Sequence, residues 1–252
     1  MSDGIWSALS GAVGQLAVLD AAANNVANAS NPGFRGDQTI FREVLSRAAT
    51  PRPNAAAQRG QFKNIRYATV DSVSTDTTQG ALVQTARPLD VAIRGDGFFT
   101  VRTPNGDRFT RVGSVQIAAD GRLTTKEGHP YIGVDKLPLR VPPTSIDAQI
   151  GPDGAVRAGR ATLGQMMVVR FSQPGALQKQ DSSLFQPSAA SGAPTAIPAD
   201  LAPATLEQSN VSAVKGMVDI VGATRAFEAC ERCIEAFRDA DRRAAMALMG
   251  NG

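Results

Sequence analysis

The stretch Ala22–Arg35, AANNVANASNPGFR, decides where the first long helix of this chain ends. An alanine-rich segment punctuated by asparagines runs into Asn31-Pro32-Gly33. The residue before a proline is sterically kept out of the α region, and glycine readily takes a positive φ. We therefore predict that the helix ends near Ser30 and that Phe34 anchors the chain as it leaves.

The residues in front of this stop carry the a/d pattern of a coiled coil. Apolar or small side chains recur with alternating gaps of four and three, at Ile5, Leu9, Ala12, Leu16, Leu19, Ala23 and Val26. At a rise of 1.5 Å per residue such a helix is about 40 Å long. The pattern predicts a surface for another helix, and an ordinary core helix is the alternative.

The same alternation returns near the other end of the chain. Its members are Ala213, Gly216, Ile220, Ala223, Phe227, Cys230, Ile234, Phe237, Asp241, Ala244 and Leu248. Two helices with such seams can pair side by side. We therefore expect long N-terminal and C-terminal helices paired in the manner of a coiled coil.

Composition limits both the fold and the class of function. The chain has 252 residues, 42% hydrophobic and only 5% aromatic, which indicates one or two compact units with aliphatic cores. The net charge of +3 comes from scattered basic residues, so we expect no nucleic-acid partner. No run approaches the ~18–20 apolar residues of a membrane span. The first residues lack a basic segment before an apolar core, so we expect no cleaved secretory signal.

Residues 81–190 show the short alternating runs and tight turns of an all-β domain. Apolar residues alternate with other types across Leu89–Ile93, which is the period of a half-buried strand. Dipeptides typical of hairpin turns separate the short strands. They are Asn105-Gly106, Asp120-Gly121 and Asp153-Gly154. We predict a small β-sandwich or barrel-like domain here.

These patterns together predict an α+β chain. Its parts are an N-terminal helix (1–34), an extended connector (35–80), a central all-β domain of short strands (81–190), a Pro/Ala/Ser-rich linker (191–205) and a C-terminal helix (206–252). Both ends are therefore expected to be helical, with the β structure between them.

The residue types needed for catalysis or metal binding do not come together in this sequence. With His129 as its one histidine, the chain offers no nucleophile, base and orienting group, so we expect no catalytic, cofactor or metal site. Cys230 and Cys233 lie inside the predicted helix rather than at its N-terminus, where a thiolate is stabilised. We expect both to be buried as small hydrophobic side chains. The Gly95-x-Gly97 pair is expected to be a turn, because the third glycine of a dinucleotide-binding motif is missing.

Three motifs follow one another along the chain. They are Asn24–Ala29 with Gly33-Phe34, then Arg87–Phe99 with Phe109–Gly113, then Leu206–Val211 with Thr224–Glu228. In this order they resemble the N-terminal signature, the central β-domain and the C-terminal helix of flagellar rod and hook proteins. The match covers nearly the whole chain, and the Arg-Pro-Leu-Asp-Val-Ala-Ile run most resembles the proximal rod type, with the distal rod type next.

The resemblance implies a structural subunit rather than an enzyme. Such proteins are exported unfolded through the flagellar type III apparatus, without a cleaved signal peptide. They assemble with copies of themselves and with other rod proteins into a helical tube that crosses the periplasm and transmits torque. The resemblance implies no cofactor, small-molecule substrate or nucleic acid.

We predict a subunit interface along the two helices and the segment that ends the first. Its residues are Ile5, Leu9, Leu16, Leu19, Asn24, Asn25, Val26, Asn28, Phe34, Ile220, Phe227, Ile234, Phe237 and Leu248. We expect the amides of Asn24, Asn25 and Asn28 to bond across helices and fix their register, with solvated asparagines as the alternative. A secreted adhesin or ligand-binding module and, more distantly, an enzyme are the alternative functions.

Overall fold

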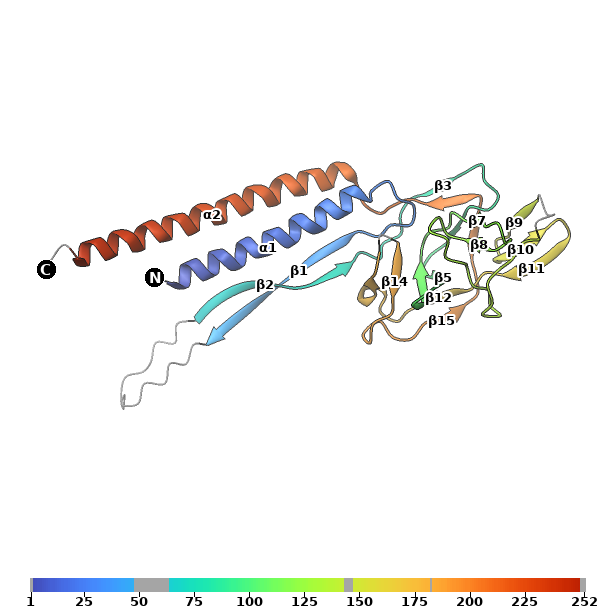
Figure 1. Cartoon of the computed structure of the whole chain (residues 1–252), viewed down its shortest axis with the longest axis horizontal. Helices are drawn as coiled ribbons and strands as arrows, with labels where there is room; N and C mark the ends of the chain where they lie inside the picture. Colours follow the sequence, from blue (N-terminus) through green and yellow to red (C-terminus); the bar gives the residue numbers. More distant parts are fainter. Residues whose placement is uncertain (1, 48–63, 143–146, 182, 250–252) are drawn as a thin grey trace. The chain divides into compact units, whose positions relative to one another are not determined.

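The computed structural model describes residues 2–47, 64–142, 147–181 and 183–249. Within these ranges the chain has a long helix near each end and a strand-rich region between them, so it is an α+β protein (Figure 1). Its contacts divide it into two compact units. The helical unit comprises Met1–Asn24, Gln38–Val73 and Val214–Gly252, and the β-unit comprises Asn25–Asp37 and Ser74–Ala213. The domain ranges expected from the sequence stay a prediction.

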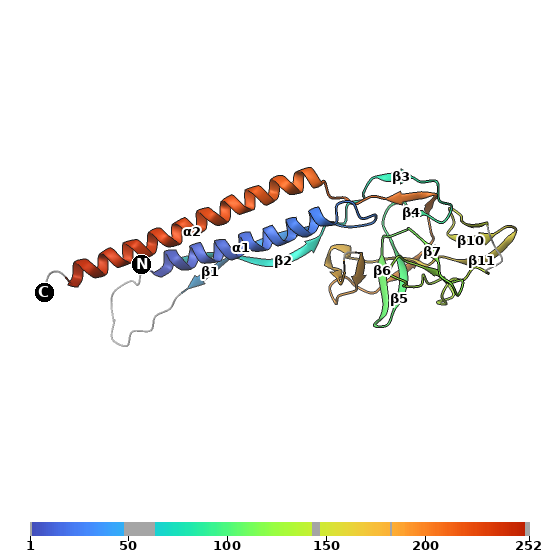
Figure 2. The same cartoon turned by 45° about the horizontal axis from the view of Figure 1, so that its top comes forward.

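The helical unit consists of α1 (Ser2–Ala27), α2 (Ala213–Met249) and the paired strands β1 (Asp37–Arg47) and β2 (Asn64–Thr75). The two helices run antiparallel, and α1 lies between α2 and the two strands in both views (Figures 1 and 2). The predicted pair of terminal helices is therefore present, and the two-stranded sheet of β1 and β2 belongs to the same unit.

Small residues on α1 allow α2 to come close. A Cβ atom added at Gly4 would lie 2.7 Å from Cζ of Phe237, and one added at Gly11 would lie 3.4 Å from Sγ of Cys230. Because these glycines lack side chains, the larger residues of α2 occupy the space above them.

The stop after α1 has the expected chemistry. The helix ends at Ala27, slightly before Ser30, and Gly33 has a φ of +71°. The Gly33 amide donates a hydrogen bond of 2.7 Å to the carbonyl oxygen of Glu207. Phe34 is buried in the β-unit, with Nζ of Lys179 3.9 Å from the centre of its ring. The predicted anchor is therefore confirmed, and its contacts lie within the chain's own β-unit.

The β-unit is built on a six-stranded antiparallel sheet. In spatial order its strands are β13 (Gln178–Lys179), β14 (Leu184–Gln186), β6 (Gly106–Thr110), β5 (Phe98–Thr103), β12 (Val168–Arg170) and β15 (Thr195–Ile197). A short 3-10 helix, Pro174–Ala176, precedes β13. Gly106, at the predicted Asn-Gly turn between β5 and β6, has a φ of +100°. The positions expected to form hairpin turns are therefore confirmed here.

Smaller sheets surround this one. They are β11 (Ala161–Gln165) with β10 (Ala155–Ala158) and β9 (Ala148–Ile150), β16 (Leu201–Pro203) with β4 (Val91–Ile93), β17 (Thr205–Glu207) with β3 (Leu82–Gln84), and β7 (Gln116–Ile117) with β8 (Leu123–Thr124). Strands β16 and β17 bring residues of the expected linker back into the β-unit. The chain enters α2 directly afterwards.

Both faces of the six-stranded sheet are buried. Phe99 of β5 belongs to a mainly aliphatic core, whereas its neighbour Phe98 belongs to a second core on the opposite face. This second core is aromatic, which the low aromatic content did not lead us to expect. Its phenylalanine rings meet edge to face, with centroids 4.9 Å apart for Phe109 and Phe171 and 5.5 Å apart for Phe98 and Phe185.

Candidate subunit interface and a buried charge network

The predicted seam of α2 lies on the side of that helix that is most covered within the chain. Gly216 and Ala223 are buried, and Ile220, Phe227 and Ile234 are half-buried. Phe237 is still 40% exposed where it covers Gly4. α2 continues through Leu248, whose side chain lies outside the described part of the chain.

The predicted seam of α1 divides differently. Ile5, Leu19 and Val26 are half-buried, but Leu9 and Leu16 are exposed. The face that meets α2 carries glycines instead, because Phe237 and Cys230 need the space there. The heptad pattern therefore identified the covered face of α1 only in part, because Ala12 of the same pattern is buried whereas Ala23 is exposed.

Leu9 and Leu16 belong to an apolar line on the outside of α1. Together with Trp6 and Val13 they form the α1 stripe, whose four side chains are between 41% and 58% exposed. Their spacing of three and four residues places them on one side of the helix. An exposed apolar line of this kind is typical of a surface that contacts another protein or a membrane.

A second apolar line occurs on α2. Val214, Met217, Val218 and Val221 form the α2 stripe, and they are between 51% and 74% exposed. Positions i, i+3, i+4 and i+7 share one side of a helix. This side of α2 carries the large apolar residues. Over the same turns of the helix, the side that is covered within the chain carries Gly216 and Ala223.

The α1 helix is apolar along most of its length, not only along the α1 stripe. Gly4–Ala27 has a mean hydropathy of 1.3, and only 17% of its most apolar window is buried within the chain. By length and composition alone this helix is apolar enough to cross a membrane, contrary to our expectation from runs of consecutive apolar residues. The core helix of a globular protein and an N-terminal signal sequence pass the same test, so hydropathy alone does not separate these cases.

The asparagine expected to bond across helices makes a different contact. Nδ2 of Asn25 donates to the carbonyl oxygen of Asp37, and the Asp37 amide donates to Oδ1 of Asn25, both at 2.8 Å. Asn25 thus joins the end of α1 to the first residue of β1. Nδ2 of Asn31 donates to Oδ1 of Asn28 at 2.7 Å, and Asn24 is exposed. The cross-helix expectation is therefore wrong for Asn25, because the backbone of Asp37 takes up both ends of its amide.

Replacing Asn25 with alanine is expected to lower the free energy of unfolding of the β-unit by about 1–3 kcal/mol, because two partly buried hydrogen bonds are lost. Urea unfolding followed by the amide NMR signals of β4 and β5 measures this change. Ser30→Ala, at an exposed position just after the same helix, is the control and should stay within about 0.5 kcal/mol. Equal stability of the two variants would contradict this role of Asn25.

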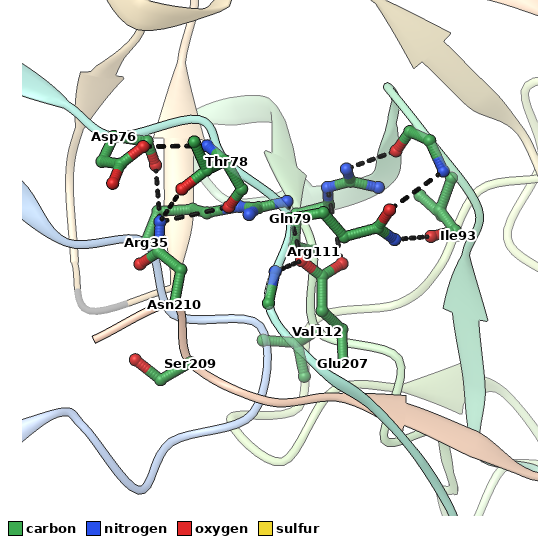
Figure 3. A network of polar contacts seen from close by, with 12 residues as sticks. Arg35, Asp76, Thr78, Gln79, Ile93, Arg111, Val112, Glu207, Ser209 and Asn210 are labelled. Carbon is green, nitrogen blue, oxygen red and sulfur yellow. Dashed lines mark hydrogen bonds and ion pairs between the residues drawn. The ribbon is translucent and has the colours of Figure 1, made fainter. Parts of the chain in front are cut away.

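A network of buried charges lies in the β-unit (Figure 3). Glu207, at the end of β17, forms an ion pair with Arg35, whose Nη2 lies 2.7 Å from Oε1 of Glu207. Nε of Arg111 lies 3.7 Å from Oε2 of the same carboxylate. All three side chains are at most 3% exposed. The Gly80 amide also donates to the Glu207 carboxylate, at 3.0 Å. One carboxylate therefore holds three segments that are far apart in the sequence.

The second arginine is held by several further groups. Nη2 of Arg111 donates to the carbonyl oxygen of Gly95 at 2.6 Å, and its guanidinium lies 5.6 Å from the centre of the Phe98 ring. Burial lowers the pKa of Arg111 to about 10, while Glu207 acts to raise that pKa and Arg35 to lower it. The guanidinium is therefore charged at neutral pH, and its charge is buried.

Asn210 is the centre of a second network, made of uncharged hydrogen bonds, where the chain leaves the β-unit (Figure 3). Its Oδ1 accepts a hydrogen bond of 2.8 Å from the Gly36 amide, and its Nδ2 donates to the carbonyl oxygens of Asp76 and Thr78 at 3.0 and 3.1 Å. The Asp76 amide donates to the carbonyl oxygen of Gly36 at 2.8 Å. The segments before β1, after β2 and before α2 are thus tied together.

Sequence reasoning missed this network, although the motifs quoted above contain Glu207, Asn210 and Arg111. The signal was a set of charged and amide side chains inside otherwise apolar or glycine-rich motifs. The prediction that both cysteines are buried was also wrong for Cys233, which is exposed. Cys230 is half-buried against Gly11. Among the described residues no group of three His, Cys, Asp or Glu side chains is placed to hold a metal ion.

Comparisons with known proteins agree on one family. Residues 92–158 match the family model "Flagellar hook protein FlgE/F/G D1 domain", and residues 202–246 match "Flagellar basal body rod FlgEFG protein C-terminal". The flagellar basal-body rod protein FlgF of Escherichia coli (strain K12) is 31% identical, over 98% of this chain and 99% of its own. FlgG of Agrobacterium fabrum is 33% identical over 83% and 86%, and FlgG of Buchnera aphidicola subsp. Schizaphis graminum is 30% identical over 90% and 93%. The chain therefore belongs to the flagellar basal-body rod protein family.

Proposed function

We propose that this chain belongs to the proximal segment of the flagellar basal-body rod. It is a structural subunit of that rod and not an enzyme. The likeness to the FlgF of Escherichia coli, which extends over 98% of this chain, supports this assignment. The FlgG relatives given above are similarly identical over 83% and 90% of the chain, and FlgF of Mesorhizobium japonicum also aligns over 90%, so coverage does not separate the two assignments. The distal segment is the alternative.

The observation that carries the structural role is the pair of apolar stripes on α1 and α2. Neither stripe is covered within the chain, although each follows one side of a long helix. Burying apolar surface is favourable by roughly 25 cal/mol per Å², so neighbouring copies gain free energy by covering them. We propose that the terminal helices pack against those of neighbouring subunits in the manner of a coiled coil and form the inner wall of the tube.

We assign the predicted interface residues accordingly. Leu9 and Leu16 contact neighbouring subunits through the α1 stripe, whereas Ile220, Phe227 and Ile234 support the pairing of α1 with α2. Such contacts between unlike surfaces do not close on themselves, so they propagate as a helical filament. The hydrogen bonds around Asn210 hold together three segments of the β-unit, at Gly36, Asp76–Thr78 and Asn210.

We further propose that the chain reaches the rod through the flagellar type III export apparatus without a cleaved signal peptide, and that its other partners are rod proteins. Membership of the flagellar basal-body rod protein family supports this proposal. Mass spectrometry of the protein in purified basal bodies tests it. An intact N-terminal peptide is expected, and a mature N-terminus inside α1 would contradict the proposal.

Electron microscopy of basal bodies from cells with this gene deleted and then restored tests the structural role. We expect truncated rods without the protein and complete rods when it is restored. The length of the remaining stub separates the two assignments, because loss of a proximal subunit leaves a shorter stub than loss of a distal one. Intact rods in the deletion strain would overturn the proposed function.

A further inference from the structure

A cavity of about 180 Å³ in the β-unit lies beside the buried charge network. Arg35, Arg111 and Arg170 line it, and Arg170 is exposed at the end of β12. Phe98 and Phe171 form an apolar part of the wall. The cavity therefore combines guanidinium groups with aromatic surface in a space much larger than the ~30 Å³ that one water molecule takes up in the liquid.

Several guanidinium atoms of this site have no acceptor. Among the described residues, Nη1 of Arg35 and both Nε and Nη1 of Arg111 are buried without a hydrogen-bond partner. Nε of Arg111 lies 3.7 Å from Glu207, which is close enough for an ion pair but too far for a hydrogen bond. Buried donors are normally satisfied, since leaving one unpaired is costly. These atoms are closed off from solvent, so an acceptor in the cavity pairs with them once the arginine side chains turn toward it.

The charges around the cavity do not balance, and positive charge is in excess. Three arginines line it or its mouth, and the carboxylates that face them are those of Glu207 and Asp96. Three positive charges against two negative ones leave a formal charge of +1. A single negative charge placed in the cavity would balance the site.

We propose that this cavity binds a carboxylate group carried on a short apolar stem. The planar fork of a guanidinium pairs with a carboxylate through two parallel hydrogen bonds, and the aromatic wall of Phe98 and Phe171 covers the methylene groups behind it. The carboxylate comes either from an aspartate or glutamate of a neighbouring subunit or from a free anion. The first source rests on the proposed function, whereas the site itself does not.

Titration of the full-length chain with glutarate, at constant ionic strength, tests the site. NMR signals of the arginine Nε–H groups of Arg35 and Arg111 are expected to shift and saturate. Arg170→Gln removes one charge at the mouth and should weaken binding by about twofold to fivefold, the effect of an exposed charge pair. Asp96→Asn should tighten binding, because it removes the carboxylate that competes for the same arginines.

Arg140→Gln is the control, because Arg140 is exposed and does not line the cavity. It should bind glutarate as the unchanged chain does. The proposal is overturned if no signal saturates, or if Arg170→Gln and Arg140→Gln bind equally well. Either result would mean that the cavity does not bind a carboxylate.

Sedimentation of polymerised protein in the presence of glutarate separates the two sources. If a neighbour's carboxylate occupies the cavity, bound glutarate competes with it and raises the concentration of unpolymerised chain. If glutarate binds but leaves polymerisation unchanged, the site takes a free anion. A chain that binds glutarate and never polymerises would count against the proposed function and in favour of the free anion.

Discussion

Val218→Asp is expected to abolish polymerisation while leaving the single chain folded. Val218 lies at the centre of the α2 stripe and is 66% exposed, so the substitution removes little packing within the chain. In the proposed assembly the same position is covered, and an unpaired carboxylate there costs several kcal/mol. A loss of about 3 kcal/mol per contact corresponds to a rise of roughly a hundredfold in the concentration of unpolymerised chain.

Val218→Leu is the matched control, because it keeps the α2 stripe apolar at the same position. Sedimentation of both variants measures polymerisation, and circular dichroism checks that the helical content of the two is the same. In cells we expect truncated rods and loss of motility for Val218→Asp only. Normal polymerisation of Val218→Asp would show that the α2 stripe is not a subunit interface.

Local sequence patterns were sufficient for the elements whose cause is local. The Asn31-Pro32-Gly33 stop acts through backbone sterics within three residues, and it ends α1 close to the predicted place. The Asn-Gly turn at Gly106 follows from the positive φ that the hairpin requires. Both features depend on neighbours in the sequence, so no knowledge of the fold was needed to predict them.

The face that each helix turns toward its partner was less predictable. The heptad pattern in α1 marks Leu9 and Leu16, yet in this chain the glycines at positions 4 and 11 meet α2. A helix that contacts its own chain on one side and neighbouring chains on another carries two overlapping patterns. Periodicity does not show which surface of a helix the chain itself covers.

The buried network was beyond the reach of sequence patterns for a different reason. Arg35, Arg111 and Glu207 come from three distant segments, and no spacing rule relates them. Many arginines and glutamates of this chain are exposed, so residue type alone did not single these out. Their burial follows from the pairing of β17 with β3 and from the turn at Gly33, which bring the three side chains together.

Replacing Glu207 with glutamine is the strongest test of what this network does. The change keeps the shape of the side chain but removes the carboxylate that pairs with both Arg35 and Arg111. Removing one partner of a buried ion pair typically costs 3–5 kcal/mol, since the remaining charge is left unpaired. We therefore expect the free energy of unfolding of the β-unit to fall by about 3–5 kcal/mol.

The same urea titration, followed by the amide signals of β4 and β5, measures this loss. Glu127→Gln makes the identical chemical change at an exposed position of the β-unit and should stay within about 0.5 kcal/mol. If Glu207→Gln matched that control, the ion pair would contribute no net stability. A carboxylate bound in the neighbouring cavity would then have to balance the two arginines, and added glutarate should stabilise Glu207→Gln more than the unchanged chain. The two variants thus distinguish a network that closes on itself from one completed by a bound anion.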